Sequence, residues 1–251
     1  MTTSSRNRRA GLFNIILWRG HTGQRAVTLT FDDGPHPVHT ERILRILSRH
    51  QVPAAFFPLG RHVERYPELV RETARQGHLI GNHTYGHRHL VFLSRRAVRE
   101  ELIRCSGLID EITGQKPVFF RPPRGLLGWN ALREATRLGM RTVLWTCSSR
   151  DWTRPGVTAI ARRVLSGSRR GSIILLHDAK YDDLEEDRDQ TVRALPLIIR
   201  GLRRRGYRFV SLDDLLGGRP VPEPPRATGR EQEDDRSGRF GLAGLSEEHP
   251  C

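Results

Sequence analysis

The sequence contains very little lysine. Only Lys116 and Lys180 are present among the 42 basic residues, so the other 40 are arginines. The arginines are scattered along the chain rather than interleaved with stacking aromatic residues in one patch, which argues against nucleic acid binding and favours codon bias. The formal net charge of +14 still favours anionic partners, such as phosphorylated glycans or lipid head groups.

Cysteines and long apolar runs are scarce as well. The three cysteines, Cys105, Cys147 and Cys251, are an odd number without a closely spaced pair, which excludes a disulfide framework and a zinc-cysteine site. No apolar run is long enough to cross a bilayer. The 251 residues, 37% of them hydrophobic, are sufficient for one domain with a full core.

We expect different behaviour at the two ends of the chain. In residues 1–25, arginines precede an apolar run, which is the charge order of a signal peptide. The run is short, contains Asn14 and lacks a small-residue cleavage site. We therefore expect a segment that packs on the domain or lies at a membrane surface, and a cytoplasmic or membrane-peripheral protein. Residues 26–216 form the predicted domain, and residues 217–251, rich in proline, glycine and charge, a disordered tail.

Residues 27–35, with the sequence VTLTFDDGP, predict a buried strand that ends in a turn at Gly34 and Pro35. Asp32 and Asp33 lie at its end. Neighbouring side chains of a strand point to opposite sides, so one carboxylate could bind a cation while the other holds a proton. The alternative is an ordinary turn, because Asp, Gly and Pro are the usual turn residues.

A histidine pair follows in residues 83–87, with the sequence HTYGH. On a helical turn, the spacing of four places His83 and His87 on one face, as in metal-binding pairs. The alternative is a pair of surface histidines, since His62, His78 and His89 are also nearby.

Strand and helix patterns alternate along the predicted domain, with polar motifs at the carboxyl ends of strands. This arrangement predicts an α/β barrel. We expect further strands at 54–57, 78–80, 118–120, 142–145, 172–176 and 208–210, and helices at 39–47, 67–76, 94–113, 130–138, 157–165 and 191–205, with Thr40 as a candidate N-cap.

Three more motifs follow TFDDGP and HTYGH in order: RPPRG at 121–125, SRDW at 149–152 and LLHD at 175–178. Together, the five motifs resemble the polysaccharide deacetylase family, also called the NodB homology domain or carbohydrate esterase family 4. The resemblance spans about residues 27–216. It implies a single domain with a distorted, incomplete (β/α) barrel.

The resemblance also implies a metal-dependent hydrolase. Asp33, His83 and His87 supply the two imidazoles and one carboxylate of catalytic zinc sites, so we expect a divalent metal, Zn²⁺ first and Co²⁺, Ni²⁺ or Mn²⁺ as alternatives. Asp32 corresponds to the general base of the family, and Arg121 to the residue that orients it.

The acid side of the site is assigned in the same way. His177 corresponds to the general acid that protonates the leaving amine, and Asp151 to the carboxylate that holds it. Trp152 and Leu175 correspond to the apolar groove around the acetyl methyl group and the sugar. Without the other motifs, a core histidine is the alternative for His177.

Two positions depart from the family pattern. Arg124 stands where an aromatic residue is usual, although the family role there belongs to a backbone amide that binds the oxyanion. Its guanidinium could bind a phosphate or carboxylate of the substrate. Ser148 stands where the fourth motif often carries an acid.

The expected reaction is hydrolysis of the N-acetyl amide of N-acetylglucosamine-type sugars in a glycan or oligosaccharide, with release of acetate. The expected partner is an N-acetylated carbohydrate, for which an anionic substituent is an option, and no nucleic acid. The alternatives are deacylation of another acylated sugar, either lipid-linked or an O-acetyl ester, and a non-catalytic glycan-binding module.

Overall fold

The structure is a computed structural model that describes residues 16–20 and 23–217. Most of the expected N-terminal segment and all but the first residue of the expected tail lie outside these residues. Ile16–Leu17 forms a short strand, β1, that pairs in parallel with residues 142–143. In the described part of the chain, no helix has the length and apolar character that crossing a membrane requires.

The strands form two parallel sheets. The larger sheet has the order β4-β3-β2-β8-β7, with β9 beside the first half of β2, and the smaller has the order β1-β6-β5. The strands are β2 (Ala26–Asp32), β3 (Ala54–Phe57), β4 (Leu79–Ile80), β5 (Phe119–Phe120), β6 (Arg141–Val143), β7 (Cys147–Ser148), β8 (Ser172–His177) and β9 (Arg208–Phe209).

Two isolated bridges connect the sheets: Asn82 pairs in parallel with Phe120 beyond β4, and Arg19, just after β1, pairs antiparallel with Ser172 of β8. Within the described residues, the sheets do not close into one continuous hydrogen-bonded barrel. This agrees with the expected distorted, incomplete (β/α) barrel. Parallel strands bring their carboxyl ends to one rim, which is where the predicted motifs lie.

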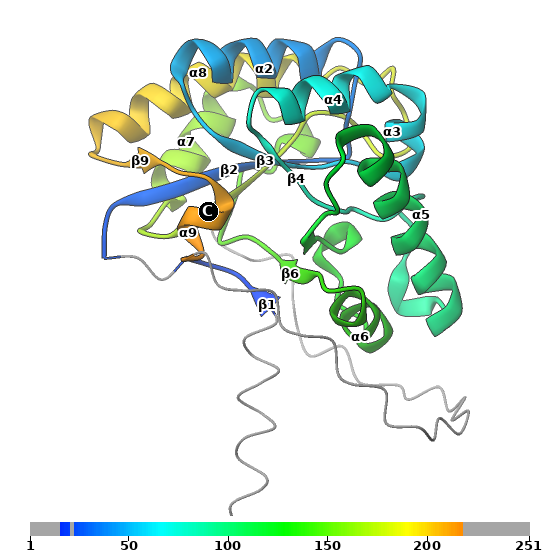
Figure 1. Ribbon diagram of the computed structural model, residues 1–251. Helices are drawn as coiled ribbons and strands as arrows, with labels where there is room; N and C mark the ends of the chain where they lie inside the picture. The colour runs from blue at the N-terminus through cyan, green and yellow to red at the C-terminus, as the bar shows by residue number, and fades with distance from the viewer. Residues whose placement is uncertain (1–15, 21–22, 218–251) are drawn as a thin grey trace, which may run out of the picture.

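Helices cover the outside of the sheets. Figure 1 shows α2, α4, α7 and α8 over the larger sheet, with α5 and α6 on the other side of the molecule. The helices are α2 (His39–His50), α3 (Gly60–Arg65), α4 (Pro67–Arg75), α5 (Arg95–Thr113), α6 (Trp129–Arg137), α7 (Val157–Gly167), α8 (Asp189–Arg204) and α9 (Leu212–Leu215), with 3-10 turns η1 (Leu90–Phe92), η2 (Pro123–Gly125) and η3 (Asp151–Thr153).

Strand β2 has two buried faces of different character. Val27, Leu29 and Phe31 belong to the hydrophobic cluster that includes residues of α2, α7 and α8. The alternate residues on the other face include Thr30 and Asp32, which are buried and bind a guanidinium inside the incomplete barrel. The alternation of a strand therefore leaves the outer face apolar and makes the inner face polar toward its end.

Local details differ from the predictions. Helix α2 begins at His39 after Val38, and no side chain caps it. Thr40 is not an N-cap, because its hydroxyl donates instead to Asp178 Oδ2 across 2.5 Å. Helix α3 was not expected, since its six residues are too few to show a periodic apolar pattern.

Candidate metal-dependent active site

The carboxylates of Asp32 and Asp33 face the same site and do not point to opposite sides of a strand. Asp32 is the last residue of β2, whereas Asp33 has a φ of 75°, so the strand geometry ends between them. His83 Nε2 lies 3.5 Å from Asp33 Oδ1 and 3.9 Å from Asp32 Oδ2. The expectation of opposite sides is wrong because the left-handed backbone of Asp33 turns its carboxylate back toward the site.

The histidine pair belongs to a loop and not to a helical turn. Thr84 and His87 have left-handed backbone angles, with φ values of 71° and 58°. The two imidazole rings nevertheless meet, with centroids 5.2 Å apart. The expected pairing is therefore correct and its helical explanation is wrong, because two left-handed residues fold the segment back on itself.

Buried polar groups hold this loop in place. Asn82 donates to Leu102 O and Ser106 Oγ and accepts from the backbone amide of Thr84 at 2.8 Å. The carboxylate of Glu101, on α5, accepts from the amide of Gly86 at 2.7 Å. Helix α5, the longest of the described helices, thus supports the histidines as well as the core.

The tautomer of His83 suits metal binding. Its Nδ1 lies 2.7 Å from the carbonyl oxygen of Arg121, and a carbonyl can only accept, so Nδ1 carries the proton. In the neutral ring, Nε2 then has a lone pair that faces the carboxylates. A backbone carbonyl in this position is the usual way in which proteins orient a metal-binding imidazole.

Asp33, His83 and His87 fit a divalent cation. Their ligand atoms all lie within 4.8 Å of one another, and all three residues are buried. Asp33 Oδ1 is buried without a hydrogen-bond partner among the described residues, and His87 Nε2 lies 3.4 Å from it. An unpaired buried carboxylate oxygen is costly, and a cation bound beside it removes that cost.

The protonation states also suit a cation. Burial by itself raises the pKa of Asp33, but the imidazoles of His83 and His177 outweigh burial and hold that pKa well below its ordinary value. Burial, with the neighbouring His83, lowers the pKa of His87 to about 3. An ionised carboxylate and a neutral imidazole are the forms that bind metals.

Arg121 lies inside the barrel, completely buried. One guanidinium nitrogen, Nη1, donates to Asp32 Oδ1 and to Thr30 Oγ1, each at 2.7 Å. The guanidinium carbon lies 4.2 Å from the centroid of the Phe57 ring. Asp32 is thus held in one orientation by a buried cation, which satisfies one carboxylate oxygen and leaves Oδ2 on the side of His83.

His177 and Asp151 form the second buried pair. His177 Nδ1 lies 2.8 Å from Asp151 Oδ1, and the amide of His177 donates to Asp151 Oδ2 at 2.8 Å. Thr191 also donates to Oδ2. Burial by itself lowers the pKa of His177, but the charge and hydrogen bond of Asp151 outweigh it and raise that pKa to about 9. His177 therefore carries a proton at neutral pH.

Aromatic side chains flank the site on two sides. Trp152 packs edge-on against His177, with ring centroids 5.3 Å apart, and is 44% exposed. The ring of Tyr181 stacks on His87 at 4.1 Å, and its hydroxyl accepts from Arg124 Nη2 at 2.8 Å. Leu175 is only 2% exposed, so it is available to a ligand only as part of the floor.

Sequence reasoning missed Tyr181, Asn82, Glu101, Thr30 and Thr191. None of them was assigned a role from the five motifs, and all but Thr30 act through a neighbour that only the three-dimensional structure identifies. Thr30 was nevertheless accessible, because a threonine one alternation before Asp32 must share its face of the strand. The other four lie on loops or helices whose approach the strand pattern does not predict.

The fold and the site together define an α/β domain with a buried group of two histidines and one aspartate that could hold a metal ion, and comparisons with known proteins identify its family. The family model for polysaccharide deacetylase matches residues 19–143. The chain is 40% identical to a chitooligosaccharide deacetylase of Bradyrhizobium sp. over 202 residues, which is 77% of this chain and 92% of that protein. The protein belongs to the polysaccharide deacetylase family.

Solved structures agree. One is a peptidoglycan N-acetylglucosamine deacetylase in complex with an N-oxidanyl-benzamide ligand. It is 34% identical to this chain, with a TM-score of 0.77, and the match covers 83% of this chain and 96% of that one. A carbohydrate esterase family 4 pseudoenzyme from Bacillus anthracis is 29% identical, with a TM-score of 0.75, over 83% of this chain and 71% of that one. The family therefore includes this fold both as an enzyme and as a pseudoenzyme, and the residues of the site must distinguish the two.

Proposed function

We propose that the protein removes the acetyl group from N-acetylglucosamine units of a glycan, with release of acetate. The observation that carries the proposal is the meeting of three sets of residues on one rim. These are the cation ligands Asp33, His83 and His87, the Asp32–Arg121 pair and the His177–Asp151 pair. Residue 32 of β2 is directly opposite residue 177 of β8, so a base and an acid flank the same position.

Asp32 acts as the general base in this proposal. Its Oδ1 is bound by Arg121, which fixes the orientation of the carboxylate, and its Oδ2 remains on the side of the cation ligands. Asp33, His83 and His87 would hold a divalent cation, and Zn²⁺ suits their two imidazoles and one carboxylate. When bound, such a cation activates the attacking water and polarises the acetyl carbonyl.

His177 acts as the general acid. Its Nδ1 donates to Asp151, so Nε2 is the atom that can deliver a proton to the sugar nitrogen. Proton transfer is necessary because an amide anion is too poor a leaving group to depart unaided. Trp152 beside His177 and Tyr181 beside His87 suit the two faces of a sugar, since aromatic rings provide apolar area with a polar edge.

The substrate class is supported by the relatives. One is named a chitooligosaccharide deacetylase and another a peptidoglycan N-acetylglucosamine deacetylase. Arg124 adds an exposed cation at the edge of this site, in contact with Tyr181. We propose on this basis that glycans with an anionic substituent bind more tightly than neutral ones.

The experiment measures acetate release from N-acetylated chito-oligosaccharides and from peptidoglycan fragments. Chelated protein, protein reloaded with Zn²⁺, Co²⁺, Ni²⁺ or Mn²⁺ and an Asp32→Asn variant are compared, with Glu111→Gln on the surface of α5 as the matched control. Metal-dependent release that Asp32→Asn abolishes and Glu111→Gln preserves supports the proposal. Stoichiometric metal binding without release from any N-acetylated sugar, O-acetyl ester or lipid-linked sugar would instead indicate a non-catalytic module.

A further inference from the structure

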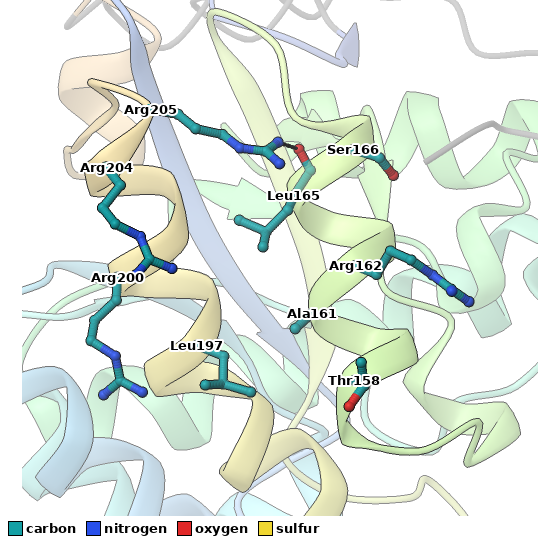
Figure 2. Close-up of a pocket in the computed structure, with 9 residues that line it drawn as sticks. All are labelled: Thr158, Ala161, Arg162, Leu165, Ser166, Leu197, Arg200, Arg204 and Arg205. Atoms are coloured by element: carbon teal, nitrogen blue, oxygen red, sulfur yellow. Dashed lines mark hydrogen bonds between the residues drawn. The ribbon is translucent and has the colours of Figure 1, made fainter.

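A groove lined by arginines lies between α7 and α8, away from the active site (Figure 2). The groove has a volume of about 420 Å³. Its lining residues are Thr158, Ala161, Arg162, Leu165, Ser166, Leu197, Arg200, Arg204 and Arg205. None of them belongs to the candidate active site, and four of the nine are arginines.

The groove arginines lack acidic neighbours along the chain. No Asp or Glu occurs in residues 157–177 or 190–212, which include all of α7 and, apart from its first residue, α8. Arg205 reaches across the groove and donates to the carbonyl oxygen of Leu165. Within the described part of the chain, Arg162, Arg200 and Arg204 make no hydrogen bond or ion pair.

Several exposed arginines on other helices are paired with an acid of the same helix. Arg96 binds Glu100 on α5, Arg75 binds Glu72 on α4, and Arg45 binds Glu41 on α2. The groove therefore combines several uncompensated guanidinium groups in one place. Besides carboxylates, phosphates are the groups that match a guanidinium, because both accept two parallel hydrogen bonds from it.

The rest of the groove is apolar. Leu197 is 39% exposed and lies one turn before Arg200 on α8, while Ala161 and Leu165 face it from α7. No aromatic residue lines the groove, so it lacks the stacking surface that bases and sugar rings use. Cations around an exposed leucine match the boundary between phosphate head groups and acyl chains.

We propose that the α7–α8 groove binds phosphate head groups and docks this face of the protein on an anionic phospholipid surface. The orientation is compatible with activity. Helices of βα units run back from the carboxyl rim of the sheet, so the C-terminal halves of α7 and α8, with Arg200 and Arg204, lie toward the opposite end from the active site. A lipid surface bound there leaves the active site open to a glycan.

The test is sedimentation of the full chain with vesicles of phosphatidylcholine alone or with 30 mol% phosphatidylglycerol (roughly the anionic fraction at which surface attraction is strong). The groove variant is Arg200→Gln with Arg204→Gln. The matched control is Arg71→Gln with Arg133→Gln, which removes the same charge from exposed positions on α4 and α6. Unchanged far-UV circular dichroism and acetate release establish that both variants are folded.

We expect the protein to bind only the anionic vesicles. Each arginine contributes roughly fivefold to the affinity for an anionic surface, so the affinity of the groove variant should fall about 25-fold. The affinity of the control variant should be unchanged or fall much less. Equal loss of affinity in both variants would show that only the net charge of the protein matters, and would overturn the proposal. Failure to bind anionic vesicles, with inorganic phosphate or a soluble polyphosphate still retained through Arg200 and Arg204, would also overturn membrane docking.

Discussion

At the scale of single residues, the site depends on which polar atoms already have a hydrogen-bond partner within the protein. Arg121 occupies one oxygen of Asp32, its backbone carbonyl occupies one nitrogen of His83, and Asp151 occupies one nitrogen of His177. In each case the remaining polar atom faces the site. Orientation, rather than the presence of Asp and His, thus distinguishes this arrangement from a chance cluster of polar residues.

The pH dependence of activity tests the His177–Asp151 pair. The pKa of His177 is raised to about 9 by Asp151, so the proton is present at neutral pH and is lost as the pH rises through about 9. Asp151→Asn removes the charge that raises this pKa. We expect the alkaline limb of the profile of kcat/KM against pH to move to lower pH in Asp151→Asn, which initial-rate measurements between pH 5 and 10 (roughly the range of histidine titration here) would detect.

The same pair affects stability with a defined sign. Because the pKa of His177 is higher in the folded protein than its ordinary 6.5, the contribution of His177 to the free energy of unfolding is complete below about pH 6.5 and is lost as the pH rises through about 9.

For the activity profile, an alkaline limb that stays in place in Asp151→Asn would show that another group provides the proton. Glu185→Gln, an exposed acid of the loop after β8, is the matched control.

At the scale of elements, loops between strands and helices carry the ligands, and helices hold those loops. Glu101 on α5 accepts from Gly86, between the two predicted histidine ligands. Glu101→Ala leaves this buried amide unpaired, whereas Glu101→Gln keeps an acceptor. We expect metal affinity to fall by about 10–100-fold in Glu101→Ala and by less in Glu101→Gln, as measured by calorimetric titration with Zn²⁺.

A second element-scale prediction concerns the packing of α5 against α6. Glu134 on α6 is completely buried and forms ion pairs with Arg95, Arg99 and Arg137. The three arginines retain some exposure to water, so they can be solvated when the carboxylate is removed. We expect Glu134→Ala to lower the free energy of unfolding by about 1–3 kcal/mol in urea denaturation.

Glu68 on α4 provides the comparison for Glu134, because it is exposed and Glu68→Ala removes a carboxylate without a buried ion pair. Its expected change is within about 0.5 kcal/mol. Equal losses in the two variants would contradict the role assigned to Glu134.

At the scale of the whole molecule, a bound cation links segments that are distant in the sequence. Asp33 follows β2, while His83 and His87 follow β4, so occupancy of the site ties two strand ends together. A ligand that binds only the folded state stabilises it by RT ln(1 + [L]/Kd), about 2.7 kcal/mol at 100 times Kd. We expect Zn²⁺ to raise the melting temperature of chelated protein and His83→Ala to abolish most of that rise.

His89 is the matched control for His83, since it lies in the same segment but outside the three predicted ligands. His89→Ala should retain the Zn²⁺-dependent rise in melting temperature, which differential scanning calorimetry measures. A rise of equal size in His83→Ala would place the bound metal elsewhere.

Much of the architecture follows from the sequence alone. The alternation of strands and helices predicted the parallel α/β arrangement, because the apolar periods of strands and helices are local properties. The five motifs predicted the family. The positions of the site residues at the carboxyl ends of β2 and β8 followed as well, since parallel strands must bring these ends to one rim.

Only the tertiary structure decided how those residues face one another. Left-handed backbone at Asp33, Thr84 and His87 turned a predicted strand end and a predicted helical turn into two loops that meet, and no periodic pattern reveals such angles in non-glycine residues. The supporting roles of Asn82 and Glu101, and the groove between α7 and α8, arise from contacts between distant segments. Local sequence determines the elements because their hydrogen bonds are local, whereas the side chains around the site are set by packing between elements.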